Sequence, residues 1–275
     1  MKLLEGKVAV ITGSGRGIGR KTALMFAEQG ASVVIHDIDR DAAEDSTAAV
    51  QGVGGRAVCC VGDVTERDMP EEIVQRTVAE FGKLDILVNN AGYTWDAMVE
   101  KMTDEQWYAM MDVHVTAPFR MIRAASPYMK GAAKRELDSG GIAYHRKIVN
   151  VTSMAGVTGN IGQTNYASAK AGVIGLTKAM AREWARYRIN VNAVAFGFMD
   201  TRLTGEKEAG VSFERYGKKV EAGIPRKIRE AFLSQCPFER PGTLEEAAAP
   251  ILFLASPWAD YISGHVLLVN GGTFM

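Results

Sequence analysis

Three side chains in the second half of the chain have the types and spacing needed for acid–base chemistry. Tyr166 and Lys170 lie four residues apart in the run Tyr-Ala-Ser-Ala-Lys, so on a helix they share one face. A phenol has an ordinary pKa of about 10, and a neighbouring ammonium group favours the phenolate and lowers that value. Ser153 ends an apolar run 13 residues before Tyr166, and its hydroxyl could hold a substrate oxygen beside the phenol. The set predicts proton exchange with a carbonyl or an alcohol, although a Tyr-x-x-x-Lys pair alone usually marks a solvated helix face.

A glycine-rich turn near the N-terminus suggests what the other reactant is. The run Thr-Gly-Ser-Gly-Arg-Gly-Ile-Gly, from Thr12 to Gly19, follows a short apolar segment and opens a helical pattern. Glycines let the backbone approach a pyrophosphate closely, and the helix N-terminus supplies free N–H groups. We therefore predict a dinucleotide site rather than a flexible turn without a ligand. The residues of the turn expected to contact the cofactor are Gly13, Ser14, Gly15, Arg16, Gly17, Ile18 and Gly19.

Asp37 points to the kind of dinucleotide. It ends the second apolar run, 18 residues after Gly19. An acidic residue there accepts hydrogen bonds from the adenosine ribose, and its charge repels a 2′-phosphate. NAD is therefore the expected cofactor. Arg16 could instead reach a 2′-phosphate, which keeps NADP as the alternative.

Polar residues also follow the next two apolar runs. Asp63 comes after the third run and could contact the adenine amine, or it could simply cap a helix. Asn89, Asn90, Ala91 and Gly92 end the fourth run. Paired amides at that point can hold neighbouring strands together and contact a cofactor.

The alternation of apolar and amphipathic stretches along the chain predicts the elements that must position these residues. Short, nearly continuous apolar runs, typical of parallel strands covered on both faces, occur at 8–11, 32–36, 57–61, 84–88, 147–151, 190–195 and 266–269. Amphipathic helical stretches lie between them, at 20–29, 40–51, 68–81, 104–129, 167–186 and 244–254. This alternation predicts one α/β domain over residues 1–275, of Rossmann type, with a doubly wound parallel sheet of about seven strands and helices on both faces.

Two segments interrupt this alternation of strands and helices. Residues 131–146 are polar and contain Ser-Gly-Gly, which suggests a surface excursion between a helix and the fifth strand. Residues 198–241 are long and charged and show no strand pattern. Since long insertions in compact domains are often lids or binding loops, we expect a substrate loop there.

Composition excludes several function classes. Lys plus Arg and Asp plus Glu both total 32, so the zero net charge argues against binding driven by nucleic-acid phosphates. The three cysteines and four scattered histidines suggest neither a disulfide scaffold nor a metal site. The apolar run near the N-terminus is too short for a signal peptide, and no stretch has the length of a membrane span. We expect a soluble cytoplasmic protein without nucleic-acid or membrane partners.

Taken together, the motifs resemble those of the short-chain dehydrogenase/reductase family. The resemblance rests on the Thr12–Gly19 turn, Asp63-Val64, Asn89-Asn-Ala-Gly92, Ser153 and Tyr166-Ala-Ser-Ala-Lys170, in that order and spacing, and extends from about Lys7 to the terminal Val269-Asn-Gly-Gly272. The family implies a nicotinamide-dependent oxidoreductase that interconverts a carbonyl and a secondary alcohol. It implies that Tyr166 is the acid or base, that Lys170 lowers the Tyr166 pKa and binds the nicotinamide ribose, and that Ser153 holds the substrate oxygen. Further cofactor contacts are expected from Ile38, Asp63, Val64, Asn90, Ala91, Gly92, Tyr166, Lys170, Gly197, Met199 and Thr201.

The chain departs from the family pattern at three places. His114 stands where the family often has an Asn that links the catalytic Lys to a water chain, and it either sustains that relay or only packs. Phe196 replaces a common Pro, and it either walls the nicotinamide pocket or changes the turn. Asn270 replaces the usual acidic residue, which we expect to be a modest structural change.

On the substrate side, the pattern is closest to 3-oxoacyl-carrier-protein reductases, with hydroxysteroid and polyol dehydrogenases as the alternative. A non-catalytic NAD-binding redox sensor is a further reading, disfavoured because both Tyr166 and Lys170 are present. Basic residues between positions 215 and 229 form either a solvated face or a docking surface for a coenzyme A or acyl-carrier thioester. The family also implies a homotetramer formed through the helices at 104–129 and 167–186.

Overall fold

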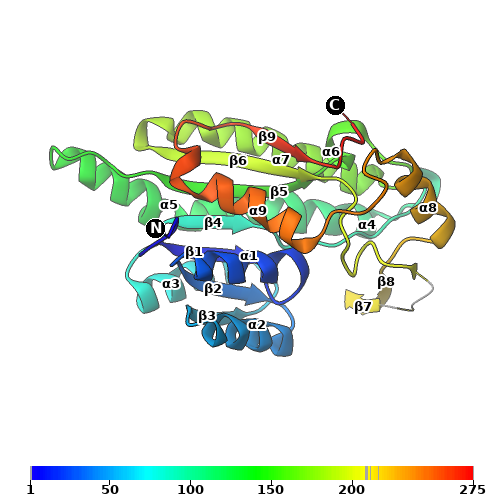
Figure 1. Ribbon diagram of the computed structural model, residues 1–275, viewed down its shortest axis with the longest axis horizontal. Coiled ribbons are helices and arrows are strands. Elements are labelled where there is room, and N and C mark those ends of the chain that lie inside the picture. The colour runs from blue at the N-terminus through cyan, green and yellow to red at the C-terminus, as the bar shows by residue number, and fades with distance from the viewer. Residues whose placement is uncertain (1, 208–209, 211, 216, 275) are drawn as a thin grey trace.

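The fold was analysed in a computed structural model, which describes residues 2–207, 210, 212–215 and 217–274. Within these residues the centre is a parallel sheet of seven strands in the order β3-β2-β1-β4-β5-β6-β9 (Figure 1). Its strands are β1 (Val8–Thr12), β2 (Ser32–Asp37), β3 (Arg56–Val61), β4 (Ile86–Asn89), β5 (Arg146–Ser153), β6 (Ile189–Phe196) and β9 (Val266–Val269). The predicted doubly wound α/β fold of seven parallel strands is confirmed.

Helices cover both faces of this sheet, because alternate strand residues point to opposite sides. Ala9 and Ile11 of β1 pack with one apolar cluster, which includes residues of α1, α2 and α9, whereas Val10 between them joins a second cluster with α3, α5 and α7. The bounds of these helices are α1 (Gly17–Glu28), α2 (Arg40–Gly52), α3 (Met69–Phe81), α5 (Ala117–Asp138), α7 (Thr164–Trp184) and α9 (Leu244–Ala255). Every predicted strand is present, and so is every predicted helix except the stretch at 104–129, which is divided; the ends of the others differ by a few residues.

The strand order reverses between β1 and β4, since the chain winds outward from β1 in both directions. In open parallel sheets, ligands bind in the crevice outside the carboxyl ends of the strands at such a point. The short helices α4 (Asp104–Met111) and α6 (Ala155–Thr158) lie beyond this edge of the sheet, and so does α8 (Arg226–Gln235) (Figure 1). Single 3₁₀ turns occur at Val99–Lys101, Ala185–Tyr187 and Pro257–Ala259.

The helical stretch predicted at 104–129 is not continuous. One π-helical turn, Asp112–Thr116, separates α4 from α5. The apolar spacing of the sequence does not reveal it, because the backbone stays near helical angles through the turn. Such turns inside helices are rare and occur frequently at functional sites. This one carries His114.

Both interrupting segments contain more structure than the sequence suggested. Helix α5 continues to Asp138, because Met129 and Ala133 bury one face of the extension, so the first half of the 131–146 segment is not a surface excursion. The 198–241 segment contains an antiparallel hairpin of β7 (Ser212–Arg215) and β8 (Lys218–Glu221), followed by α8. The expectation of no strand there is wrong. Phe213 and Val220 face each other across the hairpin, but the charged residues around them hide the alternation.

Residues that follow α5 attach this helix to the amino-terminal edge of the sheet. The Tyr144 hydroxyl donates a hydrogen bond to Asp85, a fully buried carboxylate that also accepts a hydrogen bond of 2.8 Å from the Val8 N–H. The cations of Lys7 and Arg146 both lie 4.0 Å from the Tyr144 ring centroid. Burial is the largest of the causes that raise the pKa of the Tyr144 phenol. This cluster lies at the opposite edge of the sheet from the crevice, so we assign it to stability.

No helix in the described ranges is both long and apolar enough to cross a membrane.

Candidate active site

The carboxyl end of β5 and the first turns of α7 bring the predicted acid–base residues together. Ser153 is the last residue of β5, and Tyr166 and Lys170 lie on one face of α7. The Lys170 ammonium nitrogen is 5.6 Å from the centroid of the Tyr166 ring. All three side chains line one open cavity of about 890 Å³. The spacing in the sequence therefore produces the constellation that it suggested.

Hydrogen bonds fix α7 against β5. Thr152 Oγ1 donates to the Lys170 carbonyl at 2.7 Å, and Lys170 Nζ donates to the Val151 carbonyl at 2.8 Å. Gly156 permits the close approach of α6 to α7, because a Cβ there would lie 2.6 Å from the Lys170 carbonyl carbon. Lys170 is consequently 4% exposed and held in one direction.

Burial sets the protonation of this pair. It raises the pKa of Tyr166 to about 12, although a hydrogen bond from Ser153 acts in the opposite direction and Asp96 adds to the rise. Burial also lowers the pKa of Lys170 to about 7. The expected depression of the Tyr166 pKa by Lys170 is not found, because burial dominates. Near and above neutral pH, both side chains favour their uncharged forms.

His114 lies behind these two residues. Its ring packs edge-on against Tyr166, with centroids 5.1 Å apart and an interplanar angle of 86°. Its Nε2 lies 2.8 Å from the Tyr93 carbonyl, so Nε2 carries the proton and donates it there. Burial, together with the charge of Lys170, holds the His114 pKa well below its usual value. Nδ1 of this neutral ring is buried and has no hydrogen-bond partner among the residues described, so it is available as an acceptor.

The glycine turn is fastened to the end of β4. Gly13 has a positive φ of 63°, and a Cβ there would lie 2.7 Å from the Ala91 Cα, so both the conformation and the space require glycine. Asn90 Nδ2 donates to the carbonyls of Thr12 and Gly13 at 2.9 Å each. Asn90 therefore shapes the turn in addition to facing the cavity.

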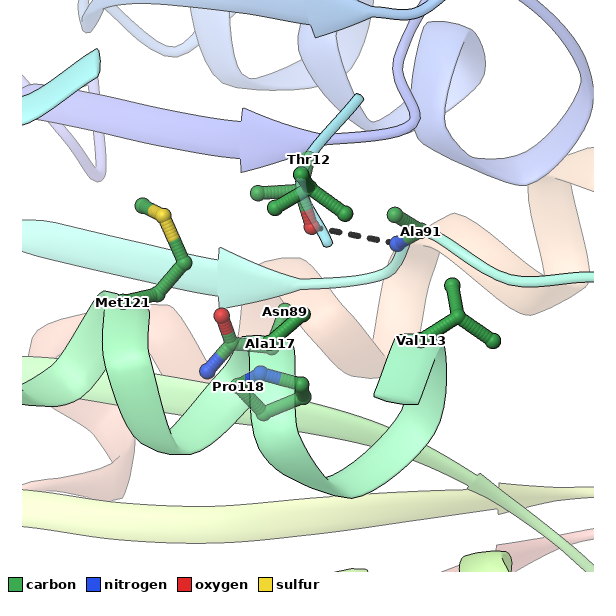
Figure 2. Close-up of a pocket in the computed structure, with 8 residues that line it drawn as sticks. Thr12, Asn89, Ala91, Val113, Ala117, Pro118 and Met121 are labelled. Atoms are coloured by element: carbon green, nitrogen blue, oxygen red, sulfur yellow. Dashed lines mark hydrogen bonds between the residues drawn. The ribbon is translucent and has the colours of Figure 1, made fainter. Parts of the chain in front are cut away.

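Figure 2 shows the floor beneath this turn, where Thr12 Oγ1 accepts a hydrogen bond of 3.1 Å from the Ala91 N–H. Asn89 Nδ2 donates to Asn150 Oδ1 at 2.8 Å, which joins β4 to β5. Asn89 Oδ1 lines a cavity of about 10 Å³ and has no partner within the described chain. That volume accommodates about one water molecule. The paired amides predicted to join neighbouring strands thus do so through Asn89.

The end of β2 holds the residues predicted to face the ribose. Asp37 Oδ2 accepts a hydrogen bond of 2.9 Å from the Gly15 N–H, and Asp37 Oδ1 accepts one of 3.1 Å from the Asp39 N–H. Arg16 forms an ion pair of 2.7 Å with Asp39. The carboxylate of Asp37 is thus fixed at the cavity, and the cation that could serve a 2′-phosphate already has an acidic partner.

Most residues predicted from the sequence line this single cavity: Gly13, Arg16, Gly17, Ile18, Gly19, Asp37, Ile38, Asp63, Val64, Asn90, Ala91, Gly92, His114, Ser153, Tyr166, Lys170, Gly197, Met199 and Thr201. Ser14 and Gly15 are not among its lining residues. Ser14 is buried and its hydroxyl donates to the Ile11 carbonyl at 2.7 Å, so it holds the turn from below. The cradle suits a dinucleotide, because it combines glycine backbone, a helix N-terminus and an acidic residue at the end of β2.

Phe196 and Asn270, the two other departures from the family pattern, also lie at or near the cavity. Phe196 lines it and is at the same time 6% exposed and packed with the core cluster that includes α1 and α9. Asn270 builds the terminal turn, because its Nδ2 donates to the Phe274 carbonyl at 2.7 Å and its Oδ1 accepts from the Gly272 N–H at 3.0 Å. Phe274 then lines the same cavity.

The substrate side contains residues that sequence reasoning missed. Phe213 of the hairpin packs edge-on against Tyr93, with ring centroids 5.4 Å apart, and both line the cavity. Asp96 and Gln163 line it as well. Tyr93 and Asp96 follow the Asn90-Ala-Gly92 motif directly, so their place along the chain was a usable signal. Phe213 offered none, because its hairpin was not expected.

Comparison with known proteins agrees with this geometry. A family model described as short chain dehydrogenase matches residues 7–212. The 3-oxoacyl-[acyl-carrier-protein] reductase FabG of Thermotoga maritima is 42% identical over 269 residues, covering 98% of both chains. The enzyme of the same name from Vibrio cholerae is 39% identical over 272 residues, covering 99% of both. That of Escherichia coli is 36% identical over 271 residues, covering 98% of both.

Proposed function

The chain belongs to the short-chain dehydrogenase family and is an NAD(P)-dependent oxidoreductase acting on CH–OH groups, and we propose that its substrates are 3-oxoacyl thioesters. The observation that carries the proposal is the placement of Ser153, Tyr166 and Lys170 in the cavity that the glycine turn also lines. The thioester class is supported by relatives of that printed activity, which match nearly the whole chain.

A nicotinamide dinucleotide held by the glycine turn and Asp37 would supply or accept the hydride at the carbonyl carbon. We propose that Tyr166 donates its proton to the carbonyl oxygen during reduction and recovers it during oxidation, while Ser153 orients the same oxygen. Lys170, 5.6 Å from the ring centroid, stabilises the phenolate that proton donation leaves behind. His114 presents an uncharged Nδ1 that is available as a hydrogen-bond acceptor.

We propose NAD as the preferred cofactor, with NADP as the alternative. Asp37 would face the ribose hydroxyls, and its charge would repel a 2′-phosphate. The pairing of Arg16 with Asp39 supports the same preference, because it reduces the positive charge available to a phosphate.

The 198–241 segment is proposed as the substrate loop of a single Rossmann domain, since Phe198, Phe213 and Ile224 all line the cavity. Several of its cations have acidic partners: Lys218 pairs with Glu105, and Arg226 lies 3.1 Å from Glu230. These pairs favour a solvated face over a strongly basic docking surface. A carrier-bound substrate remains the proposed partner because of the relatives' printed activity.

We propose that the protein is a homotetramer. Tyr108 of α4 and Phe119 of α5 are 62% and 46% exposed, and Ala171 and Gly175 leave an open, small-residue surface on α7. Such surfaces allow helices of neighbouring subunits to approach closely. Light scattering at micromolar concentration should give four times the monomer mass, and a monomer would contradict the proposal.

The substrate proposal is tested by oxidation of NADH and NADPH with acetoacetyl thioesters of N-acetylcysteamine, coenzyme A and acyl carrier protein. A steroid and polyol panel runs in parallel, in both directions. We expect turnover of the thioesters with NADH preferred at subsaturating cofactor. Turnover of only steroids or polyols would overturn the substrate class, and a strong preference for NADPH would overturn the cofactor assignment. Cofactor binding without turnover of any compound would indicate a sensor.

A further inference from the structure

A carboxylate that the reaction itself does not need faces the cavity beside Tyr166. Asp96 lies in the loop after β4 and lines the cavity together with Tyr166 and Ser153. Its Oδ2 accepts a hydrogen bond of 2.8 Å from Gln163 Nε2. Gln163 immediately precedes α7, the helix that carries Tyr166. One side-chain hydrogen bond therefore links the Asp96 carboxylate to the start of the helix that carries Tyr166.

Two further bonds hold Asp96 in place. Gln163 Oε1 accepts from Asn160 Nδ2 at 2.9 Å, so the amide of Gln163 is oriented with its nitrogen toward Asp96. The Ala97 N–H donates to the Gly162 carbonyl at 3.0 Å, which joins the two loops through their backbones. Because the amide is neutral, this arrangement fixes the charge of Asp96 without cancelling it.

The charge of Asp96 is not neutralised by an ion pair with any residue that the structure describes. Burial raises the pKa of the Asp96 carboxyl, and the hydrogen bond from Gln163 and the charge of Lys207 act in the opposite direction; the ammonium of Lys207 is itself 3.0 Å from Glu221. The Lys and Arg side chains that line the cavity have other partners: Arg16 pairs with Asp39, Arg202 lies over the Phe213 ring at 5.9 Å, and Lys170 donates to the Val151 carbonyl at 2.8 Å.

Asp96 is close enough to act on the reacting group. Asp96 lines the same cavity as Tyr166 and Ser153, and its charge adds to the rise in the Tyr166 pKa that burial mainly causes. A substrate anion bound beside the Tyr166 hydroxyl would experience the same charge. In the 3-oxo acids, the carboxylate is only two carbon atoms from the reacting carbonyl carbon.

We propose that Asp96 is a specificity-determining residue that excludes substrates with a free carboxylate beside the reacting ketone and so favours neutral esters and thioesters. The inference rests on the proposed function and deepens it, since it states why a thioester and not the free 3-oxo acid is taken. Two like charges within about 10 Å at an effective dielectric constant of about 20 lower binding by roughly tenfold or more. The amide of Gln163 contributes by pointing its donor at Asp96 and away from the substrate.

The test compares matched substrates that differ only in charge. For the wild-type enzyme, the ratio of kcat/KM for methyl acetoacetate to that for acetoacetate is measured with saturating cofactor at pH 7.5. Asp96→Asn should lower this ratio by about tenfold, because the repulsion is removed while the side-chain shape is kept. Asp96→Glu is the control that keeps the charge, and it should keep the ratio within about threefold of wild type.

A second variant changes Gln163, the hydrogen-bond partner of Asp96, and leaves Asp96 itself unchanged. Gln163→Lys places an ammonium group beside Asp96, and it should also lower the ratio by about tenfold. An unchanged ratio in both Asp96→Asn and Gln163→Lys would overturn the inference. If 3-oxoacyl compounds are not turned over at all, the proposed function fails, and 4-oxopentanoate with its methyl ester then tests Asp96 separately.

Discussion

Replacement of the buried Lys170 by Met is expected to stabilise the protein near neutral pH but not at alkaline pH. The folded pKa of Lys170 is lowered to about 7 by burial, whereas an unfolded lysine has a pKa of about 10.4. Between these two values the unfolded chain binds one proton more than the folded protein. The stability of the wild type therefore rises with pH through this window, by about 1.4 kcal/mol for each pH unit.

The magnitude follows from the width of the window that can be measured. From pH 7 to pH 9.5 the wild type gains about 3 kcal/mol from this site, since Lys170 is already about half deprotonated at pH 7 in the folded state. The Lys170→Met protein lacks the titrating group, so its advantage over wild type should shrink by the same amount. It also loses the hydrogen bond of Lys170 Nζ to Val151, which costs about 1 kcal/mol at both pH values and cancels in the comparison.

Urea denaturation at pH 7 and pH 9.5, at one protein concentration, measures the difference. Lys178→Met is the matched control, because Lys178 lies on the exposed side of the same helix. Its stability relative to wild type should be the same at both pH values. If the advantage of Lys170→Met over wild type is equally large at pH 7 and pH 9.5, the folded protein does not lower the pKa of Lys170, and the reasoning is refuted.

Three further predictions concern other parts of the structure. Asp37→Ala should raise the ratio of kcat/KM for NADPH to that for NADH by about tenfold, because a negative charge at the ribose is removed; steady-state kinetics with both cofactors would expose an unchanged ratio. His114→Asn should keep activity within about tenfold of wild type and His114→Ala should lower it further, since only Asn retains an acceptor; equal rates in all three proteins would contradict the relay. Tyr144→Phe should lower the free energy of unfolding by about 1–3 kcal/mol by removing the hydroxyl that donates to Oδ1 of the buried Asp85, with kcat unaffected; unfolding and rate measurements on one preparation check both.

The parts of the fold that could be predicted from the sequence are those set by local pattern. β1 and β6 are buried along their whole length, so β1 appears as a continuous apolar run and β6 as an apolar run interrupted only by Asn190 and Asn192. The β7–β8 hairpin could not be predicted in this way, because its apolar residues are few and lie between charged residues. The π turn at Asp112–Thr116 escaped it because one extra residue in a helical turn hardly alters the apolar spacing over so short a length.

The candidate site likewise has features that could be predicted from the sequence and contacts that could not. The glycine turn and the Tyr166–Lys170 pair could be predicted because each is a local spacing within one turn or one helix. The contact of Asp96 with Gln163 joins two loops that lie 67 residues apart, and neither loop has a periodic pattern. Only the packing of β4 beside β5 brings these loops together, so their meeting is a property of the tertiary structure.

The protonation of Tyr166 and Lys170 illustrates most clearly what spacing alone does not determine. Four-residue spacing suggests that a permanent ammonium charge lowers the phenol pKa, but burial of both groups makes the uncharged pair the resting form above about pH 7. When Tyr166 donates its proton, as proposed, the phenolate that forms raises the pKa of Lys170, because opposite charges at this distance stabilise each other in a buried site. The attraction is therefore strongest when charge develops on the phenol and weak before the reaction begins. An interaction that strengthens along the reaction lowers its barrier, whereas one of constant strength does not.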